Sequence, residues 1–484
     1  MNTYKIYLAG NFIITDQKLD VENPYTQQVF ATTYLAGKEE LEIAITQAQR
    51  VQEELKNTPS FERYAILMHI SNRLKQERER LGSLLSEESG KPIAYAIAEI
   101  DRSVQTFLIA AEESKRLPKE YISLDWTVAG KGKEGIIKYF PIGLVAGIAP
   151  FNFPMNLAVH KIAPAIAAGC PIILKPASST PLSTLELAKI IDETTLPKGA
   201  VSILPMDRNM GNQLVTDNRF KLLSFTGSPA IGWKMKEQSG KKKVVLELGG
   251  NAGVIVTESA NMEKALTKCL FGAFAYSGQI CIHIQRIYVQ ENLFDDFVEE
   301  FKKRTMNLKF GNPQNADTQI SVMIDEENAL RIKSWVHEAK HSGAKILAGG
   351  KQTGAYYEPT IITNTSTDMK ICALEAFGPI VIIEKYKTFE DAINMMNNSV
   401  FGIQAGIFTN NLKEANTAFN RLEVGGVIIN DIPTFRVDHM PYGGIKESGI
   451  GREGIKYAIL DMMEPRVMVM DNNESHNAHS NLTH

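Results

Sequence analysis

Short, continuous apolar segments alternate with helical patterns between residues 143 and 247, and this alternation limits the possible folds more than any other feature of the sequence. Helical patterns lie over residues 155–168, after Pro181, after residue 204 and over residues 229–239. This alternation predicts right-handed crossovers and a parallel sheet, and the continuous apolar character of the strands indicates that both faces are covered. The predicted strands are GLVAGIA (143–149), PIILK (171–175), VSIL (201–204), KLLSF (221–225) and VVLEL (244–248).

A second alternating block covers about residues 262–445, and amphipathic helices precede the first block over residues 38–116. At 484 residues and 53.7 kDa, the chain exceeds the size at which one hydrophobic core usually stops growing. We therefore expect two or three domains and an α/β fold class. The elements predicted in the second block are strands RIYV (286–289), PIVIIEKY (379–386) and GVIIN (426–430) and helices over 292–305 and 326–342.

Residues 120–140 differ from the regions on either side. Segments 120–129 and 134–140 are β-rich and are joined by a Gly-Lys-Gly turn, which predicts a projecting hairpin. PRVMVM (465–470) is an isolated late strand that requires a partner, and the polar tail after Asp471 is predicted to be mobile. In a monomer the hairpin and the late strand would leave exposed edges, which favours pairing with another subunit.

Composition excludes several classes of function. Lys and Arg number 52 and Asp and Glu number 55, so a formal charge of −3 gives no basic footprint for nucleic acid or for an anionic membrane. Four cysteines cannot form a disulfide framework and indicate a reducing compartment. No signal-peptide pattern is visible, and no apolar run approaches the roughly 20 residues of a membrane span. We expect a cytoplasmic protein that binds neither nucleic acid nor membrane.

Residues that can carry chemistry follow the predicted strands and turns. Cys281 ends the glycine-containing turn SGQIC, whereas Glu247 and Asn152 stand at or just beyond the carboxyl ends of strands. Lys175 and the Thr226-Gly227-Ser228 turn occupy similar positions, where parallel sheets collect their active sites. Each also has a purely structural interpretation. Cys281 could be a small buried residue, Glu247 a cap for a turn and Asn152 part of an Asx turn. Lys175 could extend its side chain to solvent, and residues 226–228 could be an ordinary strand–glycine–helix turn.

Together these residues fit one chemistry. A thiolate adds to an aldehyde, an amide holds the oxyanion, a dinucleotide accepts hydride and a carboxylate activates water. The sequence resembles the aldehyde dehydrogenase superfamily over residues 5–470, and the separation of Glu247 and Cys281 (281 − 247 = 34) also fits. The motifs that carry the resemblance are PFNFP, LKPAS, SFTGS, LELGGN, SGQIC, EAFGP and MPYGGIKESGIGREG.

The resemblance implies a role for each catalytic candidate. Cys281 is expected to be the nucleophile, and Asn152 is expected to form the oxyanion hole with the backbone N–H of Cys281. Glu247 matches the general base that hydrolyses the thioester. Because members that transfer the acyl group to coenzyme A commonly lack this glutamate, we expect a free carboxylate as product.

The resemblance also implies a cofactor, NAD or NADP. Members restricted to NAD usually carry a glutamate at the position of Ser178, where it repels a 2′-phosphate, so serine should admit NADP. The implied cofactor residues are Glu375 and Phe377 at the nicotinamide end, Lys175 and Ser178 at the adenosine ribose, Gly227 and Ser228 at the pyrophosphate, and Gly211 and Ile231 beside the adenine.

The expected substrate is a small hydroxylated or anionic aldehyde, because the tunnel positions include two arginines and a histidine and arginine recognises anions bidentately. PTFRVDHMPYGG is most similar to lactaldehyde and related short-aldehyde dehydrogenases, with succinate semialdehyde, glyceraldehyde 3-phosphate (non-phosphorylating) and phosphonoacetaldehyde as alternatives. Either arginine could instead be structural and pair with Glu99 or Asp438. The predicted substrate residues are Arg102, Phe153, Leu157, His160, Ile280, Ile282, Arg436 and Tyr442.

The resemblance divides the chain into a Rossmann-like cofactor domain, an α/β catalytic domain and a small β oligomerisation element, in a homodimer or homotetramer. No cluster of His and Cys with ligand spacing appears, so no metal site is expected. Two other classes are a non-catalytic dinucleotide-binding protein and a thioester-forming acyltransferase without a redox step. The predicted ranges are 1–119 and 140–249 (cofactor), 250–450 (catalytic), 120–139 and 460–471 (oligomerisation) and 472–484 (tail).

Overall fold

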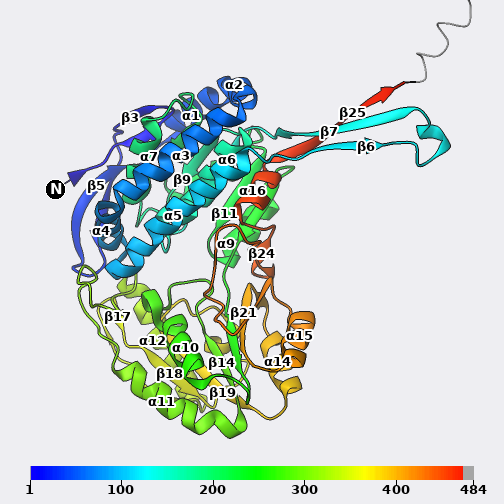
Figure 1. The fold of residues 1–484 in the computed structure, drawn as a ribbon. Coiled ribbons are helices and arrows are strands. Elements are labelled where there is room, and N and C mark those ends of the chain that lie inside the picture. The colour runs from blue at the N-terminus through cyan, green and yellow to red at the C-terminus, as the bar shows by residue number, and fades with distance from the viewer. Residues whose placement is uncertain (1, 473–484) are drawn as a thin grey trace, which may run out of the picture.

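The computed structural model describes residues 2–472, so the predicted mobile tail lies outside the described residues except for Asn472. Two large sheets with helices on both faces make up the body, and a narrow β arm projects from it (Figure 1). The predicted α/β class is confirmed.

The first sheet has eight strands in the order β24-β12-β11-β8-β9-β10-β2-β3. Its five central strands are parallel, and they coincide with the five apolar segments of the first block. The edge strands run antiparallel to their neighbours. The strands are β2 (Ile6–Leu8), β3 (Asn11–Ile13), β8 (Val145–Ile148), β9 (Ile172–Lys175), β10 (Val201–Ile203), β11 (Leu222–Thr226), β12 (Lys243–Glu247) and β24 (Gly449–Ile450).

Successive side chains of these strands enter two different cores, as expected for a sheet covered on both faces. Val145 packs with helices α3, α5, α6 and α7, whereas Ala146 packs with α1, α8 and α9. The helices around this sheet are α1 (Lys38–Arg50), α2 (Gln52–Asn57), α3 (Ser60–Gln76), α4 (Arg78–Ser89), α5 (Ile93–Ser114), α6 (Pro154–Ala168), α7 (Leu182–Asp192), α8 (Arg208–Thr216), α9 (Pro229–Gln238) and α16 (Ile455–Asp461).

The second sheet has seven strands in the order β15-β18-β19-β14-β13-β21-β22, all parallel except β15. Helices α10 and α11 cover one face, and α12, α14 and α15 cover the other. The elements are β13 (Gly253–Val256), α10 (Met262–Phe274), β14 (Arg286–Gln290), α11 (Phe294–Met306), α12 (Glu326–His341), β15 (Lys345–Ala348), β18 (Thr360–Thr363), α13 (Lys370–Ala373), β19 (Ile380–Tyr386), α14 (Phe389–Asn397), β21 (Gln404–Phe408), α15 (Leu412–Arg421) and β22 (Gly426–Ile429).

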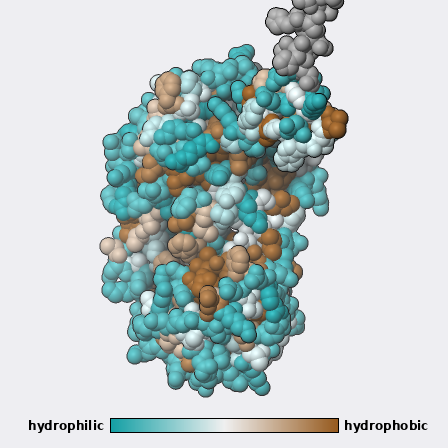
Figure 2. All heavy atoms as spheres, turned by 45° about the vertical axis from the view of Figure 1, so that its right-hand side comes forward, coloured by the Kyte–Doolittle hydropathy of each residue, from teal (hydrophilic) through white to brown (hydrophobic). Residues whose placement is uncertain are grey.

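The arm is a three-stranded sheet in which the late strand pairs with the predicted hairpin. Strand β25 (Met463–Asp471) runs antiparallel to β7 (Lys133–Pro141), which pairs on its other side with β6 (Lys119–Ser123). The outer edges of β6 and β25 have no strand partner among the described residues. Trp126 and Val128 on the arm are exposed. Figure 2 shows hydrophobic side chains at the surface on the side from which the arm projects.

Several features differ from the sequence-based expectations, including strands β13, β18 and β21 of the second sheet, which the sequence patterns did not predict. Strand β24 pairs with β12 of the first sheet, although residue 449 falls inside the range predicted for the second unit. A small N-terminal sheet, which the sequence patterns did not predict, packs beside α4. Its strands and those of two minor pairs are β1 (Asn2–Thr3), β4 (Lys18–Asn23) and β5 (Gln28–Tyr34), then β16 (Gln352–Thr353) with β17 (Tyr356–Tyr357), and β20 (Phe401–Gly402) with β23 (Ile445–Lys446).

In the part of the chain that the structure describes, no helix combines the length and apolar character needed to cross a membrane.

Candidate active site

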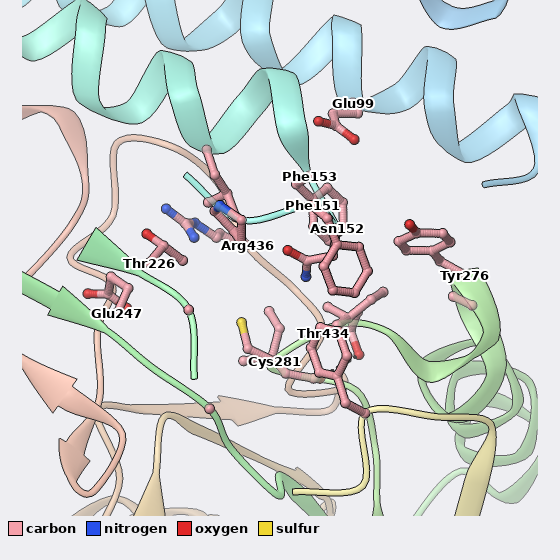
Figure 3. Close-up of a pocket in the computed structure, with 18 of the residues that line it drawn as sticks. Glu99, Phe151, Asn152, Phe153, Thr226, Glu247, Tyr276, Cys281, Thr434 and Arg436 are labelled. Atoms are coloured by element: carbon pink, nitrogen blue, oxygen red, sulfur yellow. Dashed lines mark hydrogen bonds between the residues drawn. The ribbon is translucent and has the colours of Figure 1, made fainter. Parts of the chain in front are cut away.

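A cavity of about 500 Å³ lies where the carboxyl ends of β8, β11 and β12 face the turn that leads into β14 (Figure 3). Most of the residues predicted for the catalytic, nicotinamide and substrate sites line this one cavity. They are Arg102, Asn152, Phe153, Leu157, Gly227, Ser228, Glu247, Ile280, Cys281, Ile282, Glu375, Phe377, Arg436 and Tyr442.

A tight left-handed turn presents Cys281 to the cavity. Tyr276, Ser277 and Gly278 all have positive φ, at 50°, 52° and 71°. Gly278 is required because a Cβ there would lie 2.1 Å from the backbone oxygen of Gly378. The Ser277 hydroxyl donates to the backbone oxygen of Ser321 (2.7 Å), which holds the strained segment in place.

The Cys281 thiol is half-buried, and its Sγ lies 3.2 Å from the hydroxyl of Tyr442. Burial raises the pKa of the Cys281 thiol to about 11, because the apolar surroundings disfavour the thiolate. Nucleophilic chemistry at Cys281 therefore needs local stabilisation of the thiolate.

Asn152 lies on the turn between β8 and α6, and its Nδ2 donates to the backbone oxygen of Gln279 (3.0 Å). This bond ties the Asn152 turn to the Cys281 turn. A carboxamide nitrogen carries two N–H groups, so the second can serve a substrate oxygen. The start of α6 is fixed by Glu99, whose Oε1 accepts the backbone N–H groups of Met155 (3.0 Å) and Asn156 (3.1 Å).

Glu99 is itself held by a buried ion pair with Lys91. The Nζ of Lys91 lies 3.9 Å from the ring centroid of Phe153 and 4.5 Å from that of Tyr276. Lys91 thus contacts both catalytic turns, and it lines the cavity together with Glu99. The sequence analysis did not identify Lys91 and considered Glu99 only as an ion-pair partner.

Glu247 ends strand β12 and is 4% exposed. Its backbone oxygen accepts the N–H of Gly227 (3.0 Å), but its Oε1 has no hydrogen-bond partner within the described residues. Burial, together with the negative charge of Glu453, raises the pKa of Glu247 well above its usual range. A buried, unpaired carboxyl of this kind is suited to accept a proton.

A buried ion cluster lies behind Arg436. Arg436 Nη2 pairs with Glu453 Oε2 at 2.8 Å, and Lys161 Nζ lies 3.5 Å from Glu453 Oε1. Asp438 is shared by Arg102 Nη2 (2.7 Å) and His160 Nε2 (2.8 Å).

Two substrate predictions change as a result. His160 is fully buried against Asp438 and does not line the cavity, so its predicted position in the tunnel is wrong. Arg102 pairs with Asp438, as the structural alternative anticipated, yet it still lines the cavity. The Nε atoms of Arg102 and Arg436 are buried and lack hydrogen-bond partners among the described residues.

At the nicotinamide end, Glu375 Oε1 accepts the backbone N–H of Gly250 (3.0 Å). Burial raises the pKa of Glu375 to about 7. Gly249 is required here, because a Cβ would lie 2.2 Å from Glu375 Oε2. Phe377, with φ of 49°, packs edge-on against Phe151 with their ring centroids 5.8 Å apart.

The residues predicted for the adenosine end, Lys175, Ser178, Gly211 and Ile231, do not line this cavity; they lie at or after the end of β9 and on helices α8 and α9. Lys175 packs against Gly211, where a Cβ would lie 3.0 Å from the lysine side chain. Ser178 is exposed, and Ile231 on the first turn of α9 is 48% exposed. The amino end of α9, which follows Gly227 and Ser228, suits a pyrophosphate, and the exposed Ile231 suits an adenine ring, so the residues present fit a dinucleotide.

Sequence reasoning missed several residues that support the site. Lys161 stands in an otherwise apolar helix, which is a detectable signal, and its Nζ donates to Thr226 Oγ1 (2.8 Å). Glu453 lies within the motif MPYGGIKESGIGREG but was given no role, and its partner Lys161 is 292 residues away in the chain. Among the described residues no group of three or more His, Cys, Asp or Glu side chains is arranged to hold a metal ion.

Comparison with known proteins assigns the site to a family. Residues 13–468 match the aldehyde dehydrogenase family. The chain is 42% identical to the 3-sulfolactaldehyde dehydrogenase of Priestia aryabhattai, over 97% of this chain and 98% of that protein.

Two solved structures are also similar. Aldehyde dehydrogenase 21 from Physcomitrella patens, in complex with the reaction product succinate, has a TM-score of 0.96 and 46% identity, covering 97% of this chain and 98% of that one. Glyceraldehyde-3-phosphate dehydrogenase GapN from Methanocaldococcus jannaschii, complexed with NADP, has a TM-score of 0.91 and 37% identity, covering 95% of this chain and 100% of that one. The chain therefore belongs to the aldehyde dehydrogenase family and is an NAD(P)-dependent aldehyde oxidoreductase.

Proposed function

We propose that this enzyme oxidises a small aldehyde bearing an anionic or hydroxyl group to the corresponding carboxylate. The observation that carries the proposal is the presence of Arg102 and Arg436 in the wall of the cavity that contains Cys281. The Nε of each arginine is buried and makes no hydrogen bond within the described residues, and that of Arg436 lies 4.0 Å from Asp438 Oδ1.

The balance of charge supports an anion. Two carboxylates, Asp438 and Glu453, are shared among Arg102, Arg436 and Lys161. While Glu247 is protonated, this cluster has one positive charge in excess, and a substrate anion would compensate it. The names of the similar proteins point the same way, since sulfolactaldehyde, succinate and glyceraldehyde 3-phosphate all carry an anionic group.

In the proposed reaction, Sγ of Cys281 adds to the carbonyl carbon, and the oxygen accepts hydrogen bonds from Asn152 Nδ2 and the backbone N–H of Cys281. A bound NAD(P) would supply the hydride acceptor, and loss of a hydride from that carbon would leave an acyl group on Cys281 as a thioester. Glu247 then removes a proton from a water molecule that attacks the thioester, and Cys281 leaves as the thiolate. The product is a free carboxylate.

The same proposal assigns cofactor residues. Glu375 and Phe377 would hold the nicotinamide end, Lys175 and Ser178 the adenosine ribose, and the Gly227–Ser228 turn the pyrophosphate. Gly211 and Ile231 would flank the adenine. Because Ser178 carries no charge to repel a 2′-phosphate, we expect NADP to be accepted as well as NAD.

We also propose that the enzyme is a homodimer or homotetramer. Strands β6 and β25 expose their outer edges, and apolar side chains such as Val467 and Val469 are half exposed on the arm. Sedimentation of the intact chain tests this part of the proposal.

The experiment measures kcat/KM with NAD and with NADP for 3-sulfolactaldehyde, succinate semialdehyde, glyceraldehyde 3-phosphate, lactaldehyde and hexanal. We expect a polar or anionic aldehyde to be preferred. Arg436→Leu should lower kcat/KM for the anionic aldehydes about 10- to 100-fold more than it lowers kcat/KM for hexanal. Arg421→Leu, which removes an exposed ion pair with Glu390, is the matched control. A preference for hexanal, or unchanged rates in Arg436→Leu, would overturn the proposal.

A further inference from the structure

The hydroxyl of Tyr442 is buried beside the sulfur of Cys281. Tyr442 is 3% exposed. Its hydroxyl lies 3.2 Å from Sγ of Cys281, and this is the hydrogen bond recorded for that hydroxyl within the described residues. A buried hydroxyl is costly unless it has a partner, so the position of this group depends on Cys281. Removing the hydroxyl would therefore break one hydrogen bond and leave the rest of the packing intact.

Arg436 lies directly over the same tyrosine. Its guanidinium carbon is 3.7 Å from the centroid of the Tyr442 ring. Glu453 fixes both residues, because its carboxylate binds Arg436 and its backbone exchanges two hydrogen bonds with that of Tyr442 (2.8 and 2.6 Å). The stack of guanidinium, phenol and thiol is thus held in a fixed order, and Figure 3 shows Arg436 and Cys281 directed into the same cavity.

We propose that Tyr442 is a catalytic residue: its hydroxyl donates a hydrogen bond to Sγ of Cys281 and stabilises the thiolate before the aldehyde binds, and the stacked Arg436 strengthens this donation. The inference rests on the proposed role of Cys281 as nucleophile. It adds a role for Tyr442 beyond lining the substrate tunnel.

The direction of the hydrogen bond follows from the chemistry of the two groups. A thiolate has no hydrogen to give, so once Cys281 ionises the hydroxyl must be the donor. The thiol proton leaves to water through the cavity, and the phenol keeps its own proton. A cation over the ring draws electron density from the phenol and makes its O–H a better donor, and hydrogen bonds to an ionised acceptor are the stronger kind.

The other charged groups near Cys281 oppose ionisation. Burial has the largest effect and raises the pKa of the thiol, and Glu375 and Glu247 raise it further when they are ionised. Tyr442 and Arg436 are the two groups that lower the pKa of Cys281. The stack therefore supplies the local stabilisation that a buried cysteine nucleophile requires.

The test is the rate of alkylation of the full chain by iodoacetamide, without aldehyde or cofactor, between pH 6.5 and 9.5. Mass spectrometry of peptides follows Cys281 and, as an internal reference, the half-buried Cys372 in the same molecule. We expect Tyr442→Phe to slow alkylation of Cys281 about tenfold at each pH, equivalent to a rise of about one pKa unit, and to leave Cys372 unchanged. An equal rate at Cys281 in Tyr442→Phe and in the native chain would overturn the proposal.

Two further variants sharpen the result. Tyr386→Phe is the matched control, because that buried hydroxyl donates to the backbone oxygen of Val256 and Tyr386 packs in a different part of the core from Cys281 and Tyr442, so the change should not alter the rate. Arg436→Met should slow alkylation more in the native background than in Tyr442→Phe, where only the direct effect of its charge on the thiol remains; an equal effect in the two backgrounds would overturn the part assigned to Arg436 through Tyr442. A separate measurement tests the role of Cys281 on which this inference rests. If Cys281→Ala still oxidises aldehydes, Cys281 is not the nucleophile and the proposed function fails, whatever the alkylation rates are.

Discussion

Glu247 and Glu453 are two glutamates buried to a similar degree in neighbouring parts of the site, with exposures of 4% and 2%. Glu453 binds Arg436 and Lys161. Burial alone would raise the pKa of Glu453, but Lys161, Arg436 and His160 lower it to about 2. Glu247 has an unpartnered Oε1 within the described residues, and its pKa is raised.

The comparison shows that burial does not decide what a carboxyl group does; its partners do. Glu453 stays ionised because two cations hold it, which makes it a structural anchor for Arg436. The Oε1 of Glu247 lies next to Gly443 rather than next to a cation. A Cβ at Gly443 would lie 2.8 Å from this oxygen, so glycine leaves space for the carboxyl group. An unpaired carboxyl next to a glycine is able to exchange a proton, whereas the paired carboxyl is not.

The largest expected effect is that of Glu247→Gln on turnover. An amide cannot accept a proton from water, so thioester hydrolysis should slow about 10³-fold while formation of the acyl group on Cys281 continues. Stopped-flow absorbance of reduced nicotinamide should show a burst followed by a slow steady state. A uniform slowing without a burst would contradict the separate role of Glu247.

A smaller effect, on stability, is expected for Glu453→Gln. The change leaves Lys161 and Arg436 buried without their shared anion, so the free energy of unfolding should fall by about 3 kcal/mol. Denaturant titration at pH 7 measures the loss. Glu390→Gln, which breaks only the exposed pair with Arg421, is the control and should cost less than about 1 kcal/mol.

The dependence of this loss on pH checks its cause. Because the pKa of Glu453 is lower in the folded state than its ordinary value of 4.5, its stabilisation is present above about pH 4.5 and is lost as the pH falls towards about 2. The native chain and Glu453→Gln should therefore converge in stability over that range. Equal stability of the two proteins at pH 7 would contradict the comparison.

The smallest expected effect is a gain, not a loss, in the free energy of unfolding, and it concerns Glu247. The raised pKa of Glu247 means that its ionisation opposes folding, so this residue costs stability as the pH rises above the ordinary value of 4.5. Glu247→Gln should be about 1 kcal/mol more stable than the native chain at pH 8, a gain of the kind seen when a catalytic group is neutralised. Denaturant titration at pH 5 and pH 8 tests this, and a destabilised variant at pH 8 would show that Glu247 is paired.

Much of this molecule could be predicted from its sequence. The five central strands of the first sheet and strands β14, β19 and β22 of the second were predicted because they are continuous apolar runs, whereas β13, β18 and β21 were not predicted. The position of the site at the carboxyl ends of the strands was predicted from the parallel topology. Strands β2 and β3 were missed because they have only three residues each, too short for a periodic pattern. Strand β24 was missed for the same reason, since two residues give no pattern at all. Strands β4 and β5 have six and seven residues, but β4 is largely polar and exposed and β5 mixes polar with apolar residues.

Of the ion cluster, the sequence offered only the pairing of Arg102 with Asp438, as an alternative to substrate binding. The other contacts could not be predicted, because the partners are brought together only by the tertiary fold. His160 was expected in the substrate tunnel because of the family resemblance. In the structure Asp438, which is 278 residues away, binds the His160 ring, and Arg436 lies against it.

The most direct test of the account is detection of the acyl group on Cys281. Glu247→Gln enzyme is mixed with NAD or NADP and the aldehyde of highest kcat/KM, quenched in acid within seconds and analysed by mass spectrometry of the intact chain and its peptides. The account predicts a mass increase equal to the acyl group, located on the peptide that contains Cys281 and absent from Glu453→Gln treated in the same way. An adduct on another residue, or none in Glu247→Gln while turnover persists, would contradict the account.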